Sequence, residues 1–216
     1  MKRTRILGLM LTTMLVGCFS HSTPPSRFYT LTPEIGPGEV GTAEIGVPIV
    51  GVGPFEFPRY LMRPQMVVRT EDNRLILNEF ARWGDDLDIQ FVRIAAQNVS
   101  LLSPASTAVP FPWRRHFEPD LRLVGNVNRF EADSAGSVRL ELQWAIVNLV
   151  TGETESVHDS TYRADTDASD PAAIAAAMSE VLADFSREAA RDLGEAAGRA
   201  ASASRDGGGS ASGRTD

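Results

Sequence analysis

The chain has 216 residues and a formal net charge of −7 at pH 7, with 21 Lys and Arg against 28 Asp and Glu. An acidic chain has no electrostatic basis for binding nucleic acid, so nucleic acid is excluded as a partner. The length suits one domain with a proper core, and the single cysteine, Cys18, has no second cysteine with which to form a disulfide.

Residues 1–17 have the composition of a bacterial secretory signal. A basic start is followed by an apolar run that ends at Gly17, and this run is too short for an ordinary membrane-spanning helix. Leu15-Val16-Gly17-Cys18 matches the bacterial lipobox, in which the cysteine receives diacylglycerol on sulfur and, after cleavage, an acyl chain such as palmitate on nitrogen. We therefore expect 1–17 to be a lipoprotein signal peptide, and Cys18 to carry a covalent lipid anchor.

Residues 18–26 are expected to form a lipidated tether, because Pro24 and Pro25 favour an extended chain. Phe19 stands directly after the lipidated position. Under the sorting rule of enteric bacteria, an aspartate there would retain a lipoprotein at the inner membrane. Phe19 therefore favours the outer membrane, with the domain facing the periplasm.

The first part of the domain has the pattern of short strands. "RFYTLTP" (27–33) combines aromatic and β-branched residues and predicts a first strand. "EIGVPIVGVGPFEFP" (44–58) predicts a second strand, and its Gly and Pro content indicates that it either bends or runs along an edge. Residues 66–69 and 75–77, joined by a polar turn at 71–73, predict a hairpin.

The periodicity changes to that of a helix at Asp85 or Asp86. Apolar residues recur at helical spacing from Leu87 to Leu102, and the acidic residues at the start are favourable to the helix dipole. Pro104 is expected to end this helix, and 103–113 is expected to be a loop.

Strands around 121–130, 138–148 and 155–165 follow, and together they predict a meander. Uninterrupted alternation along the first of them would place Leu121 and Val127 on one face and Phe130 on the other.

The last predicted element is a long helix. Asp170 is placed to cap it and Pro171 to occupy its first position. Its apolar stripe is formed by Ile174, Met178, Val181, Leu182, Phe185, Ala189 and Leu193. The elements predict an α+β fold, with a mainly antiparallel sheet and two helices packed on one face, in a single domain over 27–200. The remainder, 201–216, is predicted to be a disordered Gly/Ser-rich tail.

The residues do not predict an enzyme. His21 lies in the tether, and His116 and His158 stand in polar contexts without a nucleophile motif, so they are interpreted as surface histidines. Asp165, Asp167 and Asp170 lack the order of a calcium loop and are interpreted as a solvated loop that leads to a helix cap. We expect no catalytic residues, no metal and no cofactor besides the lipid on Cys18.

The stretch "FPRYLMRPQMVVR" (57–69) has a different character. Rigid apolar residues surround Arg59 and Arg63, a composition typical of a protein interface or of a groove that receives a lipid headgroup. The alternative is a loop that packs Tyr60 and Leu61 into the core while its arginines pair with acidic neighbours such as Glu79. Composition alone does not separate these two interpretations.

The order of these segments resembles a known family. A lipobox followed by "RFYTLTP", "PRYLMRPQ", "RW", "LRLVGNVNRFEAD" and "VRLELQWAIVN" is similar to the PqiC-like (paraquat-inducible) lipoproteins, auxiliary components of ABC-type transporters. The likeness spans 27–195 and departs from many members at Gly84-Asp85-Asp86. By this resemblance, the positions assigned to partner or lipid binding are Tyr60, Leu61, Arg63, Pro64, Gln65 and Trp83.

The resemblance implies an outer-membrane lipoprotein that docks an MCE-domain protein, works with the associated permease and ATPase, and in some relatives forms a homo-oligomeric ring. The leading hypothesis is therefore a non-enzymatic subunit of an MCE/ABC-type system for lipid transport between membranes. Two rivals stay open: a periplasmic carrier that holds phospholipid between the sheet and the helices, and an envelope hydrolase that depends on His116 and His158.

Overall fold

The computed structural model describes residues 24–41, 48–103, 107–113 and 117–208. The predicted signal peptide, Cys18 and most of the tether lie outside these residues, as do His21 and His116. None of the described helices combines the length and the apolar character needed to cross a membrane.

Eight strands form one sheet. They are β1 (Arg27–Tyr29), β2 (Val50–Glu56), β3 (Gln65–Arg69), β4 (Leu75–Trp83), β5 (Ala108–Pro110), β6 (Leu121–Asp133), β7 (Ser137–Asn148) and β8 (Thr154–Asp165). The order is β1-β4-β3-β6-β2-β5, and β7 and β8 extend the sheet from the other side of β6. The long strand β6 therefore pairs with β7 on one side, and on the other side with β2 near its start and β3 near its end.

The expected α+β class, the two helices and the single domain are confirmed, but the sheet is mixed rather than mainly antiparallel. The hairpin β3–β4 and the meander β6–β7–β8 are antiparallel as predicted. The pairs β1–β4, β2–β5, β2–β6 and β3–β6 are parallel. Parallel pairs join segments that are distant in sequence, so no local turn pattern announces them.

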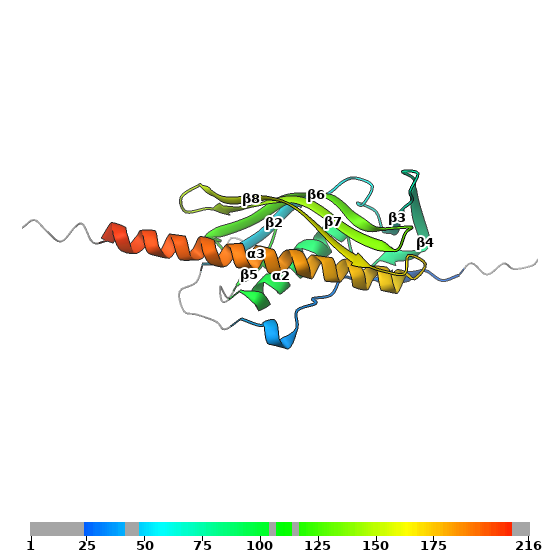
Figure 1. Ribbon diagram of the computed structural model, residues 1–216, viewed down its shortest axis with the longest axis horizontal. Coiled ribbons are helices and arrows are strands. Elements are labelled where there is room, and N and C mark those ends of the chain that lie inside the picture. Colours follow the sequence, from blue (N-terminus) through cyan, green and yellow to red (C-terminus); the bar gives the residue numbers. More distant parts are fainter. Residues whose placement is uncertain (1–23, 42–47, 104–106, 114–116, 209–216) are drawn as a thin grey trace, which may run out of the picture.

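Both helices cover the same face of the sheet (Figure 1). The helix α2 (Leu87–Leu102) packs on β2 and β5, and the long helix α3 (Pro171–Gly208) packs on β6, β7 and β8 and on α2. Aromatic rings fill the space between the layers: Phe91 is fully buried, with its ring centroid 5.1 Å from that of Phe55, 5.5 Å from Phe130 and 5.9 Å from Phe185. A short 3-10 helix, η2 (Pro37–Glu39), lies on the chain that leads from β1 to β2.

Two irregularities change which residues face the core. The strand β2 bends at Gly53, where φ is +104°, and its register with β6 shifts between Val52 and Phe55. It has a neighbour on each side, so the expected bend is present and the edge position is not. In β6, a register shift between Val127 and Arg129 turns Phe130 into the core, which the predicted uninterrupted alternation had placed on the opposite face.

The helix signals in the sequence are accurate at their starts. Helix α2 begins directly after Asp86, and the Asp170 side chain accepts a hydrogen bond from the backbone N–H of Ala172 in the first turn of α3. The predicted apolar stripe of α3 is buried along its whole length. The helix runs to Gly208, so residues 201–208 of the expected disordered tail are helical, and 209–216 lie outside the described residues.

The loop expected at 103–113 contains a short strand, β5, at its centre. Residues Ala108 to Pro110 pair in parallel with β2 and close that edge of the sheet. A three-residue strand that ends in a proline carries no period that the sequence could reveal.

Candidate partner-binding surface

The loop that joins β2 to β3 (57–64) lies over the face of the sheet that the helices leave uncovered (Figure 1). The side chain of Tyr60 fixes this loop to β6. Its hydroxyl donates a hydrogen bond to Glu131 Oε2 at 2.8 Å, and the carbonyl oxygen of Asn128 lies 3.4 Å away. Tyr60 therefore holds the loop against the sheet.

Glu131 is the centre of a charged network that the sequence analysis did not identify. Its side chain is 1% exposed, and its Oε1 accepts hydrogen bonds from Arg69 Nε at 2.7 Å and Arg129 Nε at 3.2 Å. The guanidinium of Arg69 also lies 5.3 Å from the centroid of the Tyr60 ring. A buried carboxylate is tolerated only when it is paired in this way.

The network continues along the outer sheet face to Glu141. The Oε1 of Glu141 lies 3.6 Å from Arg129 Nη1 and 3.3 Å from Arg139 Nη1.

Burial and the negative charge of Glu131 raise the pKa of Tyr60 to about 12, so the Tyr60 hydroxyl remains a donor at any physiological pH.

The other predicted site residues divide into buried and exposed groups. Leu61 and Trp83 are buried, and the backbone N–H of Trp83 donates a hydrogen bond to the Pro64 carbonyl oxygen at 2.7 Å. The Gln65 amide donates to Glu79 Oε2 at 3.4 Å. Of the six predicted positions, only Arg63 and Pro64 are exposed to solvent. The core interpretation thus describes Tyr60 and Leu61, and Trp83 is buried as well, while Arg63 and Pro64 are exposed to solvent.

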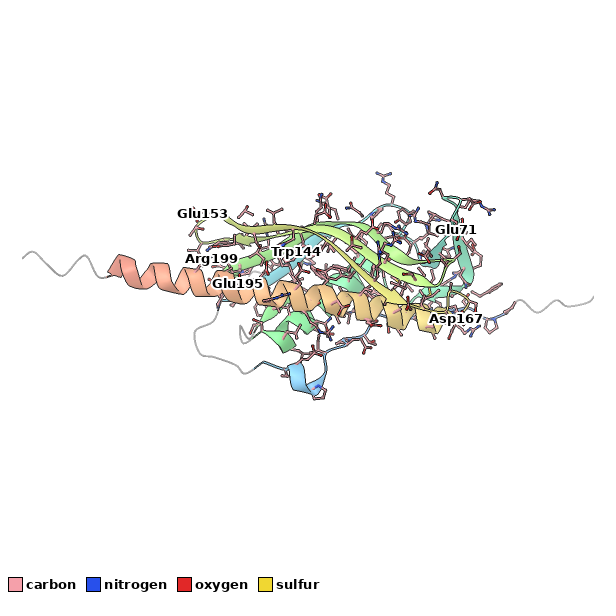
Figure 2. All side chains as sticks on the ribbon, viewed as in Figure 1. Glu71, Trp144, Glu153, Asp167, Glu195 and Arg199 are labelled. Atoms are coloured by element: carbon pink, nitrogen blue, oxygen red, sulfur yellow. The ribbon has the colours of Figure 1, made fainter. Side chains whose placement is uncertain are left out.

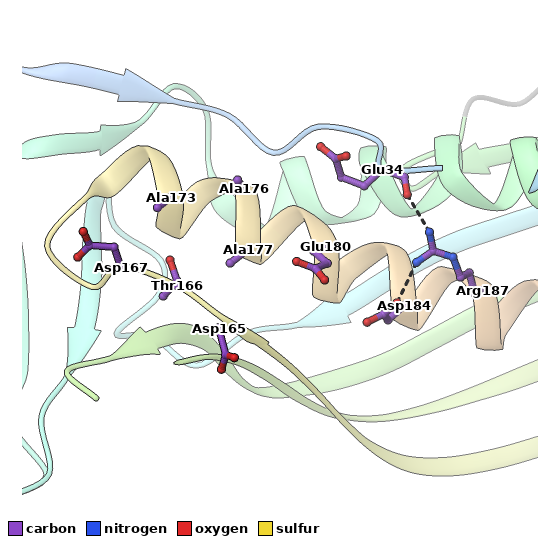
Figure 3. Close-up of a pocket in the computed structure, with 10 residues that line it drawn as sticks. All are labelled: Glu34, Asp165, Thr166, Asp167, Ala173, Ala176, Ala177, Glu180, Asp184 and Arg187. Atoms are coloured by element: carbon purple, nitrogen blue, oxygen red, sulfur yellow. Dashed lines mark hydrogen bonds and ion pairs between the residues drawn. The ribbon is translucent and has the colours of Figure 1, made fainter. Parts of the chain in front are cut away.

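A groove of ≈ 640 Å³ runs along the exposed side of α3 (Figure 3). Its floor is formed by alanines, and its rim carries Glu34, Asp165, Asp167, Glu180, Asp184 and Arg187. Arg187 ties these segments together, because it donates to Glu39 Oε2 at 2.6 Å, to Asp184 Oδ1 at 2.8 Å and to the Glu34 carbonyl at 2.9 Å. The Arg187 hydrogen bond lowers the pKa of Glu39 to about 2.

The carboxylates Asp165 and Asp167 do not converge on a metal site. Asp167 accepts hydrogen bonds from the hydroxyl and the N–H of Ser169, which lower its pKa, and Asp170 caps α3. In the described part of the chain, no group of three or more His, Cys, Asp and Glu side chains is placed to hold a metal ion.

His158 differs from the predicted surface histidine. Its ring stacks on the buried Trp144 with centroids 4.1 Å apart, and its Nε2 lies 2.6 Å from Asp192 Oδ2. Glu188, which accepts a 2.6 Å hydrogen bond from the Tyr162 hydroxyl, lies on the other side of the imidazole. The histidine thus joins β8 to α3.

The fold and this surface define a single-domain α+β protein. Its arginine-containing loop, 57–64, is held on the outer face of the sheet by the hydrogen bond from Tyr60 to Glu131. The family described as "ABC-type transport auxiliary lipoprotein component" matches residues 29–190, and the chain belongs to this family. A comparison of the sequence with curated proteins found no match.

Two solved structures show the same fold. A protein from Xanthomonas campestris, assigned to the DUF330 family, superposes with a TM-score of 0.61 at 19% identity, over 82% of this chain and 99% of that one. An uncharacterized protein superposes with a TM-score of 0.58 at 18% identity, over 80% of this chain and 98% of that one. A PelC dodecamer from Paraburkholderia phytofirmans is more distant, with a TM-score of 0.42 at 12% identity over 71% of this chain and 93% of that one.

Proposed function

We propose that the chain is a non-enzymatic lipoprotein subunit of an ABC-type system that moves lipid between membranes. Acyl chains on Cys18 hold it in the outer membrane, facing the periplasm, and the domain docks on an MCE-domain protein that works with a permease and an ATPase. The observation that carries this proposal is the family match over 29–190, which begins shortly after the lipobox and covers nearly the whole domain.

The arrangement of the two chain ends supports this role. The N-terminal stretch leaves the domain beside β3 and β4, and α3 leaves at the opposite end (Figure 1). Figure 2 places Glu71 and Asp167 at the first end, and Glu153, Glu195 and Arg199 at the second. At 1.5 Å per residue, α3 is about 57 Å long. A domain anchored at one end therefore presents its other end to a partner in the periplasm.

The carrier alternative receives no support from the core. A carrier needs a cavity between the sheet and the helices, and the packed rings of Phe55, Phe91, Phe130 and Phe185 occupy that space. The hydrolase alternative depends on His116 and His158, of which only His158 lies in the described residues. His158 is held between β8 and α3 by stacking on Trp144 and by carboxylate contacts, and this arrangement does not support the alternative.

The test is crosslinking of the tagged, acylated full chain in its own cells. We expect the chain to fractionate with outer membranes and to be crosslinked to the MCE-domain protein, identified by immunoblotting. The matched control is Cys18→Ala, which keeps the domain and removes the anchor. A chain that enters the outer-membrane fraction but is never crosslinked to the MCE-domain protein, the permease or the ATPase would overturn the proposal.

A further inference from the structure

One row of side chains crosses three strands on the outer face of the sheet near β1. Gln65 of β3 lies opposite Arg82 of β4, and Arg82 lies opposite Phe28 of β1. Residues that are directly opposite share a face of the sheet. Their neighbours Met66 and Trp83 are buried in the core, so this row points away from the helices.

Three large apolar side chains are exposed on or beside this row. Phe28 is 65% exposed, Met62 in the loop 57–64 is 49% exposed, and Phe80, two residues before Arg82, is 40% exposed. Met62 precedes Gln65 by three residues. The hydrogen bond from the backbone N–H of Trp83 to the Pro64 carbonyl oxygen holds this end of the loop against β4. We call Phe28, Met62, Arg63, Phe80 and Arg82 the β1 surface.

The β1 surface is basic within an acidic protein. Arg59 and Arg63 are exposed in the loop that ends beside β4, and Glu79 is an acidic group close to Arg82, with its Oε2 at 3.8 Å from Arg82 Nη2. Within the described residues, neither Arg59 nor Arg63 forms an ion pair. Asp85 and Asp86 follow Trp83, but they precede α2, which lies on the other side of the sheet.

The position of the chain end places this surface close to the predicted lipid anchor. The chain enters the domain at β1, and Cys18 precedes Arg27 by nine residues, a distance of at most about 30 Å when fully extended. An acylated Cys18 would therefore keep the β1 surface near the bilayer, while the far end of α3 lies on the opposite side of the domain.

We propose that the β1 surface rests on the membrane to which the chain is anchored. Phe28, Met62 and Phe80 lie at the boundary between headgroups and acyl chains, where aromatic and apolar side chains are favoured. Arg63 and Arg82 contact phosphates of anionic lipids, which attract basic residues close to the bilayer. This placement rests on the lipid anchor of the proposed function, and it assigns the predicted partner position Arg63 to lipid.

The experiment uses the acylated full chain in phosphatidylcholine vesicles with or without phosphatidylglycerol. Because Cys18 is acylated, an introduced cysteine is the one free thiol, and Phe28→Cys can be labelled with bimane. The matched control is Val150→Cys, at an exposed residue of the β7–β8 turn near Glu153, at the opposite end of the domain. We expect doxyl-labelled lipid to quench the bimane at position 28 several-fold more than at position 150.

The charge requirement is tested in the same labelled chain. Arg63→Ala and Arg82→Ala are expected to lower the quenching at position 28 in vesicles that contain phosphatidylglycerol. Arg74→Ala, which removes an exposed arginine from the β3–β4 turn, is expected to leave it unchanged. Phe80→Cys provides a second label position on the same surface, and circular dichroism confirms that each variant is folded.

The outcomes separate this inference from the proposed function. A chain that fails to float with vesicles would overturn the anchor and the placement together. A chain that floats but shows equal quenching at positions 28 and 150 would overturn the placement alone. Bimane at position 28 that is shielded from both doxyl lipid and aqueous iodide would show that a protein covers the surface, which also overturns the placement.

Discussion

Glu131→Gln is the substitution that tests the charged network most directly. It keeps the shape of the side chain but removes the negative charge that pairs with Arg69 and Arg129 at 2.7 and 3.2 Å. Removing one partner from a buried ion pair costs about 3–5 kcal/mol. The two arginines keep 25% and 20% of their side-chain surface exposed and can regain some water. We therefore expect the free energy of unfolding to fall by about 2–4 kcal/mol.

The assay is urea unfolding followed by tryptophan fluorescence, with Glu79→Gln, at an exposed carboxylate beside Arg82, as the control. Tyr60→Phe adds a second step, because it removes only the hydroxyl that donates to Glu131 and should cost about 1–2 kcal/mol. In a Glu131→Gln background the same change should cost clearly less, since its charged acceptor is already gone. Wild-type stability of Glu131→Gln, or equal costs of Tyr60→Phe in both backgrounds, would refute the network.

Four further outcomes are expected. Gly125→Ala should lower the free energy of unfolding by about 1–3 kcal/mol, because its Cβ would lie 2.3 Å from the carbonyl oxygen of Gln143, while Gly194→Ala, in open space on α3, should raise it by about 0.5–1 kcal/mol; urea unfolding measures both. Tyr60 ionises near 10 when unfolded and near 12 when folded, so its contribution is complete below pH 10 and is lost as the pH rises through 12; Tyr60→Phe should flatten this alkaline decline in the unfolding midpoint. Cys18→Ala should leave the chain without lipid and release it from membranes, and fractionation that still finds it in the membrane pellet would contradict the anchor.

Local patterns were enough to predict the elements whose stabilising contacts are near in sequence. The hairpin β3–β4 follows from two short apolar runs around a polar turn, and α3 follows from its Asp170 cap and its apolar stripe. The parallel pairs of β1 and β5 were not predictable, because each strand has three residues and its partner is distant in the chain. The register shift of β6 at Asn128 was also not predicted, because no proline or glycine stands at that position to indicate it.

The candidate site was predictable in position but not in mechanism. The composition of 57–69 indicated an unusual loop, and it left open whether Tyr60 binds a partner or packs inward. Glu131 decides between these roles, but it lies 71 residues from Tyr60 and 62 from Arg69. Arg129, in the same strand, was not enough to indicate that Glu131 would be buried, since its burial also depends on Arg69 from β3 and on Tyr60 from the loop.

The same network connects the fold to the proposed membrane contact. A loop that is free in solution loses conformational entropy when it orders at a surface, and this loss weakens binding. Tyr60 fixes the loop to Glu131 from the sheet side, and the Trp83 N–H holds the Pro64 carbonyl from the β4 side. Met62 and Arg63 lie between these two fixed points and are exposed. The buried carboxylate thus makes no contact with lipid itself, but it holds the side chains that do so in a fixed position before binding.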